Sequence, residues 1–523
     1  MLFNSYIFIL LFLPLCVDGF YTLERDWRHE RDLPYRAGRA KLWLVAFSLW
    51  FYGYFDLGYL AIMLCSIGFN YLICRLLYRA RDLRSAGEGE RVFSCRPLVG
   101  VGVTGNLALL FYFKYYDFFV ENVNALFGSH LALRHVLLPL GISFFTFQQI
   151  GFLVDVYRGE ADLTEGGRAP GLLEYMLFVS FFPQLVAGPI VSFREMAPQF
   201  RRIGRRTFSW ETFLSGIVLF GLGLGKKVLL ADTFGQAVDY GYGNIPSLNG
   251  TDAALVILFY ALQLYFDFSG YCDMARGVGK MLGFELPINF ESPYRSANLV
   301  EFWKRWHMTL NRFLTRYVYI PLGGSRRGEG RMYLNLLLVF LISGLWHGAG
   351  WNFIVWGLLH GALYALTRLW QRRRGAGIAA GENSLSGTGR AMRAAGTAAT
   401  FLFVCCAWVF FRAERLGEAF SLFERLVSGG IGLPSASLCG VFNLKEFWYV
   451  IKLLHLDLLP GSTSYLCAVF TLVSLGIVFL LPNAGQLAQR FRPRVFNMVA
   501  LALLYVWCIL SLSGVSTFLY FNF

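Results

Sequence analysis

The amino-acid composition is that of a membrane protein. Of 523 residues, 56% are hydrophobic and 15% are charged, which leaves too little polar surface for a soluble protein of this size. The formal net charge of +14 does not indicate nucleic-acid binding, because the basic residues gather in short loops between apolar runs, the positive-inside pattern of membrane proteins. We therefore expect a polytopic membrane protein with no nucleic-acid partner.

Apolar runs recur from one end of the chain to the other. Crossing ~30 Å of hydrocarbon takes about 20 helical residues. The runs cover residues 2–20, 42–60, 60–77, 98–119, 136–157, 172–190, 210–230, 253–268, 334–346, 353–369, 399–411, 466–481 and 495–519. Some are too short to span alone and are expected to be re-entrant, so the pattern predicts an all-α fold with roughly 11 to 14 membrane segments.

Charge fixes the expected orientation of both ends. The first apolar run lacks a basic segment before it and a small-residue cleavage site after it, so we interpret it as a retained helix. The basic loop that follows it predicts an extracytoplasmic N-terminus, and Arg490, Arg492 and Arg494 before the last run predict an extracytoplasmic C-terminus as well.

Two polar insertions interrupt the apolar runs. Pro183 and Gly188 are expected to break a membrane helix, and broken helices at this depth line cavities. Further on, Asp267, Asp273 and Arg276 stand in apolar surroundings, where each charge must be paired or neutralised. A structural ion pair between an aspartate and the arginine is the simplest interpretation.

The segment 287–331 is too polar to span, and its aromatic and basic residues alternate, which favours the membrane interface. We expect amphipathic helices at the cytoplasmic face. His307 lies in this segment and is a candidate second acid or base, or a residue that orients a substrate. As one polar residue on an interfacial helix, it could equally be solvated.

His347 lies in the apolar run 334–356. A neutral imidazole in a dry site can accept a proton from an attacking hydroxyl. Ionisable residues inside membranes are rare enough to indicate function, and Gly344, Gly348 and Gly350 would let a substrate or a helix approach closely. His347 is therefore a candidate general base, with a hydrogen-bonded structural histidine as the alternative.

Sequence motifs for other chemistries are missing. There is no Walker loop, G-x-S-x-G elbow, H-E-x-x-H or C-x-x-C set, which removes support for nucleotide hydrolysis, soluble-hydrolase chemistry and a zinc site. We expect no bound cofactor and no metal, so an acyl or other donor would have to arrive already activated.

Several segments in order resemble one family. They are Pro139-Leu-Gly-Ile-Ser-Phe-Phe-Thr-Phe-Gln148, Phe182-Pro-Gln-Leu-Val-Ala-Gly-Pro189-Ile, Tyr265-Phe-Asp-Phe-Ser-Gly-Tyr271, Asn289-Phe-x-Ser-Pro-Tyr294, Phe302-Trp-x-Arg-Trp-His307 and Gly344-Leu-Trp-His347-Gly. Together they resemble the membrane-bound O-acyltransferase (MBOAT) family, and within it the alginate and peptidoglycan O-acetyltransferase branch.

The resemblance implies a helical core pierced by a transmembrane tunnel, with the acyl donor entering from the cytoplasm and the acceptor from outside. It implies that His347 is the essential histidine at the constriction and His307 the second, more variable polar position. Acetyl-CoA is the donor it implies. We expect one integral membrane domain over residues 1–523, with core motifs at 40–370 and C-terminal helices with a tail at 395–523.

The chain ends in Phe518-Leu-Tyr520-Phe-Asn-Phe523. This F-x-Y-x-x-F ending is similar to a motif of bacterial cell-surface acylation systems, in which the tyrosine hydroxyl takes the acyl group before an extracytoplasmic SGNH-like transferase receives it. The resemblance thus implies an acyl relay at Tyr520. An aromatic anchor at the membrane interface is the alternative.

These observations lead to one main hypothesis and two others. The main hypothesis is an O-acyltransferase, in particular an O-acetyltransferase, of the bacterial cytoplasmic (inner) membrane, which moves an acetyl group for an exported polysaccharide such as an alginate-like polymer or peptidoglycan. A transporter or flippase for a glycolipid or polysaccharide would use similar broken helices and buried charges. A non-catalytic scaffold of an export complex would tolerate loss of His347.

Overall fold

Helices make up all the regular structure in the described part of the chain. The computed structural model describes residues 1–24, 33–85, 95–160, 169–373, 387–443, 452–453, 455, 461–514 and 518–519, and no strand occurs in these ranges. The prediction of an all-α fold is therefore confirmed. Tyr520 lies outside the described residues.

The chain divides into two compact units. Unit 1 comprises Met1–Phe220 and Ala275–Pro287, and unit 2 comprises Gly221–Met274 and Ile288–Phe523. The two long helices α10 (Trp210–Gly225) and α12 (Gly250–Met281) each contribute residues to both units. The expected single domain over residues 1–523 stays a prediction.

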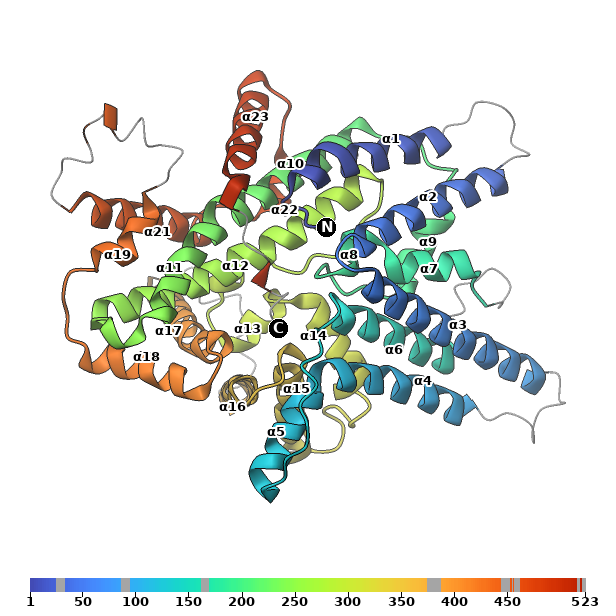
Figure 1. Cartoon of the computed structure of the whole chain (residues 1–523), viewed down its shortest axis with the longest axis horizontal. Coiled ribbons are helices and arrows are strands. Elements are labelled where there is room, and N and C mark those ends of the chain that lie inside the picture. The colour runs from blue at the N-terminus through green and yellow to red at the C-terminus, as the bar shows by residue number, and fades with distance from the viewer. Residues whose placement is uncertain are drawn as a thin grey trace. The chain divides into compact units, whose positions relative to one another are not determined.

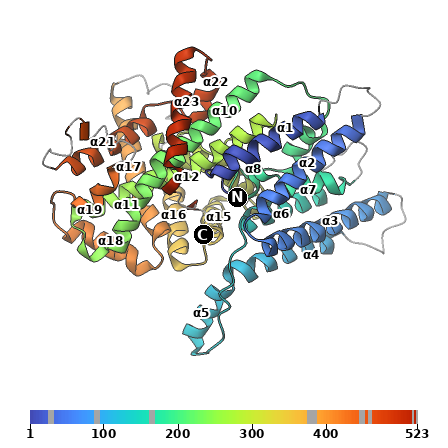
Figure 2. The same ribbon diagram turned by 45° about the horizontal axis from the view of Figure 1, so that its top comes forward.

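Unit 1 is a set of helices from the N-terminal part of the chain. They are the π-helix η1 (Phe8–Phe12), α1 (Leu13–Glu24), α2 (Leu33–Gly53), α3 (Leu57–Ser85), α4 (Cys95–Leu110), the π-helix η3 (Phe111–Tyr115), α5 (Tyr116–Phe127), α6 (Ile142–Arg158), α7 (Leu172–Ser180), α8 (Phe182–Leu185) and α9 (Phe193–Arg201). The two helices α3 and α4 run side by side (Figures 1 and 2).

Polar side chains inside unit 1 satisfy one another. The buried amides of Asn70 in α3 and Asn106 in α4 exchange hydrogen bonds of 3.1 and 2.6 Å, as interhelical polar groups do in membrane proteins. The predicted helix break is confirmed, because α7 ends at Ser180 and α8 restarts at Phe182. The side chain of Gln184 donates to the carbonyl of Phe178 at 2.8 Å and so satisfies a backbone group near the break.

Unit 2 contains the remaining helices. They are the π-helix η4 (Lys226–Ala231), α11 (Asp232–Gly243), η5 (Ile245–Ser247), η6 (Pro293–Arg295), α13 (Leu299–Arg305), α14 (Met308–Leu314), the π-helix η7 (Thr315–Tyr319), α15 (Glu329–His347), α16 (Trp351–Arg373), α17 (Gly387–Arg412), α18 (Leu416–Ser428), α19 (Ala436–Cys439), η9 (Gly440–Phe442), α21 (Ser462–Phe479), α22 (Ala484–Arg490), α23 (Val495–Leu510) and η12 (Ser511–Gly514). They hold both candidate catalytic histidines.

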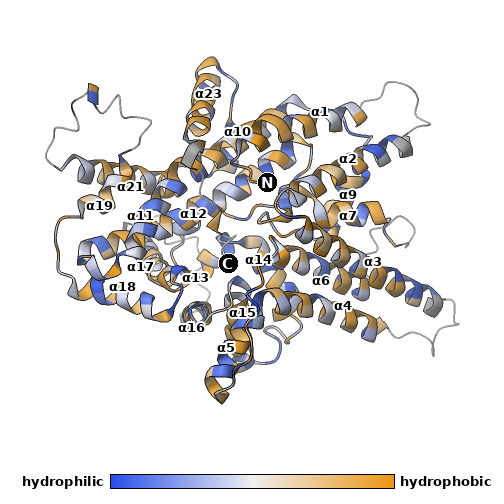
Figure 3. Ribbon diagram, in the orientation of Figure 1, coloured by the Kyte–Doolittle hydropathy of each residue, from blue (hydrophilic) through white to orange (hydrophobic). Residues whose placement is uncertain are grey.

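Seven helical stretches in the described residues are long and apolar enough to cross a membrane. They are Leu57–Asp82, Cys95–Phe127, Trp210–Gly243, Gly250–Met281, Trp351–Arg373, Gly389–Arg412 and Ser462–Phe479, and Val495–Leu510 is a shorter apolar helix. Figure 3 shows apolar residues along much of α10 and α23. The chain is thus a multi-pass membrane protein. The total of 11 to 14 segments, which counts shorter runs, stays a prediction.

Buried charges on the spanning helices of unit 2 are paired. Lys226 Nζ lies 2.7 Å from a carboxylate oxygen of Asp273, and Lys227 Nζ lies 2.7 Å from both Asp232 and Asp267. The expected pairing of the two α12 aspartates is confirmed, and the lysines of η4 are partners of both. Both lysines belong to the π-helix η4.

The helices α15 and α16 pack closely through glycines. A Cβ built on Gly357 of α16 would lie 2.5 Å from the carbonyl oxygen of Phe340 in α15. Gly344 of α15 likewise faces the backbone of Phe353 in α16. Such small residues let membrane helices approach until their backbones touch, and here they fix α15, which ends in His347.

We predict that Gly357→Ala destabilises the protein by about 1 to 3 kcal/mol, because the new methyl group must push two backbones apart. The matched control is Gly476→Ala in α21, where a Cβ would meet no atom within 4 Å. Thermal unfolding of the detergent-purified protein measures both. Equal melting temperatures for the two variants would contradict the close packing.

Candidate active site

His307 forms the turn between two short helices. Chain direction changes after α13, where Trp306 is extended and His307 adopts φ 45° and ψ 50°. A left-handed conformation is unfavourable for a residue with a side chain and persists only where the surroundings enforce it. Here the backbone N–H of Met308 donates to the carbonyl of Asn289 at 3.0 Å, which holds the turn against the preceding loop.

The side chain of Asn289 fixes the state of the His307 ring. Its oxygen accepts from the backbone N–H of Thr309 at 3.2 Å and from the Thr309 hydroxyl at 3.0 Å, and it lies 3.2 Å from His307 Nδ1. Because a carbonyl oxygen can only accept, His307 Nδ1 must carry the hydrogen. The Nε2 atom of the neutral ring is then the one with a lone pair.

Burial keeps this ring neutral. Only 1% of His307 is exposed, and desolvation lowers the pKa of His307 to about 3. The ring of Phe268 meets it edge-on with centroids 4.9 Å apart and an interplanar angle of 88°. His307 is therefore an uncharged hydrogen-bonding group at physiological pH, which excludes the solvated interfacial residue considered from the sequence.

His347 lies beside His307. Their ring centroids are 6.3 Å apart, although 40 positions separate them in the chain. Aromatic rings enclose His347, with Trp346 at 4.9 Å, Trp356 at 5.2 Å and Phe411 at 5.1 Å between centroids. Only 3% of His347 is exposed, so the two imidazoles share a dry aromatic compartment at the end of α15.

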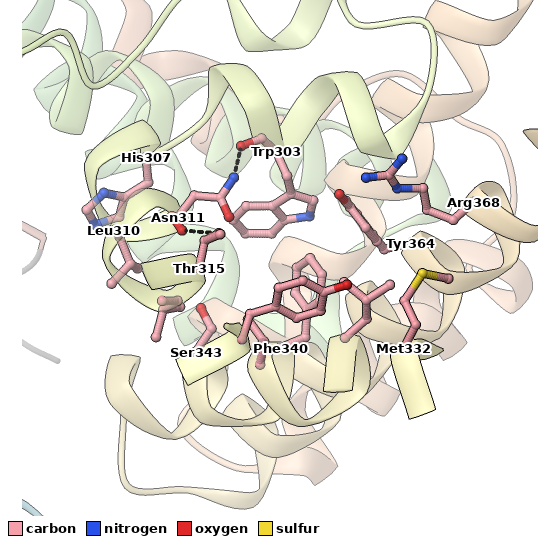
Figure 4. A pocket seen from close by; sticks show the side chains of 14 residues that line it. Trp303, His307, Leu310, Asn311, Thr315, Met332, Phe340, Ser343, Tyr364 and Arg368 are labelled. Carbon is pink, nitrogen blue, oxygen red and sulfur yellow. Dashed lines mark hydrogen bonds between the residues drawn. The ribbon is translucent and has the colours of Figure 1, made fainter. Parts of the chain in front are cut away.

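A narrow pocket of about 160 Å³ leads to His307. His307 lies at one end and Arg368 at the other, with Trp303, Asn311 and Thr315 between them (Figure 4). Hydrogen bonds hold the wall: Asn311 donates to the carbonyl of Trp303 at 2.7 Å, and the Thr315 hydroxyl donates to the carbonyl of Asn311 at 2.8 Å. The pocket is smaller than the ~300 Å³ at which typical small-molecule sites begin.

One face of α15 lines the pocket along its length. Met332, Leu336, Val339, Phe340 and Ser343 all border it, at the three- and four-residue spacing of a single helix face. A rise of about 1.5 Å per residue puts the first and last of them about 16 Å apart. His347 follows one turn after Ser343, so the pocket is an elongated passage that points to the histidine pair.

A third histidine supports the pocket wall. The indole N–H of Trp303 donates to Nδ1 of the buried His360 at 3.3 Å, and the two rings meet edge-on at 5.1 Å. In the described residues no group of three or more His, Cys, Asp or Glu side chains is placed to hold a metal ion.

The structure thus brings together two of the three predicted site residues, His307 and His347, and Tyr520 lies outside the described residues. Sequence analysis missed Asn289 as the partner of His307, and it missed Arg368 at the mouth of the pocket. Asn289 is the first residue of one of the family-like segments, and this position could have indicated a functional role. Nothing in the sequence indicated a role for Arg368, because basic residues are common at the ends of membrane helices.

Comparisons with known proteins identify a family. Residues 140–375 match the family model described as MBOAT, membrane-bound O-acyltransferase family, and this range contains both histidines, Asn289 and the pocket. Similar proteins extend the match over the whole chain. The chain belongs to the MBOAT family.

The peptidoglycan O-acetyltransferase of Helicobacter pylori is 37% identical to this MBOAT chain. The alignment covers 100% of this chain and 98% of the Helicobacter pylori protein. The "Probable alginate O-acetylase AlgI" of Azotobacter vinelandii is 34% identical with 100% of both chains covered. The teichoic acid D-alanyltransferase of Streptococcus thermophilus is 29% identical, and this alignment covers 45% of this chain and 58% of the Streptococcus thermophilus protein. The protein is accordingly an MBOAT O-acyltransferase, an enzyme rather than a scaffold or a transporter.

We predict that burial of His307 makes stability depend on pH. The unfolded chain protonates this histidine as the pH falls below about 6.5, whereas the folded chain keeps it neutral down to about pH 3. The free energy of unfolding should therefore drop as the pH falls through this window, by about 2 kcal/mol at pH 5 from this group.

Denaturation of the detergent-purified protein at pH 7.5 and pH 5 measures this effect. His307→Gln should lose less stability between the two pH values than the wild type does. His130→Gln is the control because His130 is exposed, and it should behave as the wild type. A pH dependence that His307→Gln leaves unchanged would contradict the neutral, buried ring.

Proposed function

We propose that this MBOAT enzyme is an O-acetyltransferase that takes an acetyl group from acetyl-CoA on the cytoplasmic side and passes it through the membrane for O-acetylation of an exported cell-surface polysaccharide. The observation that carries the proposal is the pair His307 and His347, 6.3 Å apart between ring centroids at the end of an elongated pocket. No bound cofactor or metal is needed for this chemistry.

In the proposed reaction, His347 is the general base. An acceptor hydroxyl gives its proton to His347 while its oxygen attacks the carbonyl carbon of the thioester. The carbon–sulfur bond then breaks, and the departing CoA thiolate takes the proton from His347 and leaves as the thiol. An oxygen ester forms, and His347 returns to its neutral state. The aromatic rings around His347 support this role because they keep out water, which would otherwise hydrolyse the thioester.

His307 orients a reactant in this scheme. Its Nδ1–H is committed to Asn289, so its Nε2 can accept a hydrogen bond from a hydroxyl and hold it for attack. A pKa of about 3 makes His307 a weak base and leaves it without a positive charge at neutral pH. The role of proton acceptor is accordingly assigned to His347.

The pocket is the proposed route of the donor. Its length of about 16 Å along α15 and its small cross-section suit the thin pantetheine arm of CoA and a short acyl group such as acetyl. Arg368 at the far end could meet a donor phosphate. Arg372, next to it in α16, pairs with Glu329 at 2.7 Å, so this end is rich in basic side chains, which supports a cytoplasmic mouth.

The relatives support a polysaccharide acceptor. Their printed names are peptidoglycan O-acetyltransferase and alginate O-acetylase, and both polymers lie outside the cytoplasmic membrane. We propose the bacterial inner membrane as its location, with both termini extracytoplasmic, as the positive charge of the loops predicts. An SGNH-like extracytoplasmic transferase is the proposed partner that completes the transfer to the polymer.

Tyr520 is the proposed intermediate acceptor. Its phenolic oxygen would take the acetyl group from the thioester, with His347 receiving the proton, and would hand it on to the extracytoplasmic partner. Its proposed role is supported by the described residues that precede it in the chain. Phe518 packs against Tyr271 and Phe268 of α12, and Phe268 contacts His307.

We predict that His347→Ala lowers release of CoA from acetyl-labelled acetyl-CoA about 10² to 10⁴-fold, the range typical for loss of a general base. The detergent-purified protein and a thiol assay serve as the measurement. His130→Ala is the matched control because it removes an exposed imidazole. Undiminished release in folded His347→Ala would overturn the assignment.

We predict that Tyr520→Phe, which removes only the hydroxyl, abolishes base-labile acetyl label on the protein while leaving its melting temperature unchanged. Mass spectrometry of the C-terminal peptide after incubation with labelled acetyl-CoA provides the measurement. Tyr465→Phe, at an exposed tyrosine of α21, is the control. Label that survives in Tyr520→Phe would remove the relay but leave the transferase.

A further inference from the structure

A buried carboxylate of α12 holds the C-terminal tail. Asp267 is 1% exposed, and its Oδ2 accepts from the backbone N–H of Leu519 at 3.0 Å. These two residues are 252 positions apart. Hydrogen bonds from N–H groups to a carboxylate are stronger than those between neutral partners, so this contact fixes one backbone atom of the tail at a defined point of the helix.

The neighbouring tail residue is held on the same side of α12. The ring of Phe518 lies 4.6 Å from the ring of Tyr271, with an interplanar angle of 31°. Tyr271 follows Asp267 by four positions, which places both on one helix face. Two consecutive tail residues thus contact one turn of α12: Leu519 through a hydrogen bond and Phe518 through ring packing.

One side chain of α12 contacts both the tail and the histidine pair. Phe268 follows Asp267 directly in α12, its ring lies 6.0 Å from that of Phe518, and it meets His307 edge-on at 4.9 Å. The attachment point of the tail is therefore one aromatic ring away from His307. Tyr520 is the next residue after Leu519 in the chain.

Lys227 holds Asp267 in place. Its ammonium lies 2.7 Å from Asp267 and 2.7 Å from Asp232, so one buried cation serves two buried acids. Buried ion pairs contribute little to stability compared with apolar residues of similar size. A role in positioning explains why two acids and a lysine occupy this apolar place.

We propose that Asp267 is a positioning residue that, supported by Lys227, anchors the C-terminal tail at Leu519, the residue that precedes the proposed acyl carrier Tyr520 in the chain. This inference rests on the proposed relay function, but the anchor itself can be tested without activity. Asp267 does not take part in the chemistry; it sets the register of the segment that does.

The first measurement is hydrogen–deuterium exchange of the C-terminal peptide in the detergent-purified full-length protein. Asp267→Ala should speed exchange of the Leu519 amide at least tenfold, because its acceptor is gone. Asp267→Asn keeps an acceptor oxygen and should give an intermediate rate. In both variants Lys227 keeps Asp232 as a partner. The matched control is Asp273→Ala, which removes another α12 acid, one paired with Lys226, and should leave the rate unchanged.

The second measurement is the ratio of acetyl label on the tail to CoA released. Asp267→Ala should lower this ratio at least tenfold. Leu519→Pro removes the donor N–H without touching α12 and should have the same effect, whereas Leu519→Ala keeps the N–H and should not. In the Asp267→Ala background, Leu519→Pro should add nothing further.

The outcomes separate the anchor from the reaction. Unchanged amide exchange in folded Asp267→Ala would overturn the anchor. Faster exchange with an unchanged labelling ratio would overturn its positioning role. If the wild type releases no CoA, the proposed function fails, and the exchange rates alone then decide whether Asp267 holds the tail.

Discussion

The side-chain oxygen of Asn289 is the point on which the candidate site depends. It serves His307 and both donors of Thr309, and so it fixes at once the backbone turn, the ring orientation and the tautomer. Without this acceptor the buried N–H of His307 would have to find another partner or bear the cost of desolvation. A left-handed φ at His307 is the conformational strain that this network maintains.

The apolar surroundings impose the rest of the architecture. Polar groups away from water need internal partners, and in unit 2 several buried charges share one acceptor or donor. Lys227 serves two acids, and Asp267 serves both a lysine and a backbone amide. Such shared partners couple distant parts of the chain, because the loss of one group leaves several others unsatisfied.

The two histidines stand in different environments. Asn289 and burial make His307 a neutral acceptor of low basicity, whereas His347 stands among tryptophan and phenylalanine rings at the end of a helix. Two imidazoles in one compartment can therefore have different tasks, as pairs of titratable groups in other enzymes do. Close packing of α15 on α16 at glycines holds the helix that ends in His347.

Much of this protein could be predicted from its sequence. Composition and the recurrence of apolar runs predicted a helical membrane protein, and Pro183 predicted a helix break close to where α7 ends and α8 begins. His307 and His347 were recognisable because an ionisable residue in apolar surroundings needs a reason. The short motifs around them carried the family resemblance, because the chemistry of a site restricts the residue types near it in the chain.

Only the tertiary structure decided which residues meet. The 6.3 Å between the histidines, the hydrogen bond from Leu519 to Asp267 and the role of Lys227 all join segments far apart in the chain. Periodicity and motifs report on neighbours along the chain, and they do not specify which of several polar residues will share a buried acceptor. That choice follows from how the helices pack, because packing alone determines which unsatisfied groups lie within hydrogen-bonding distance of one another.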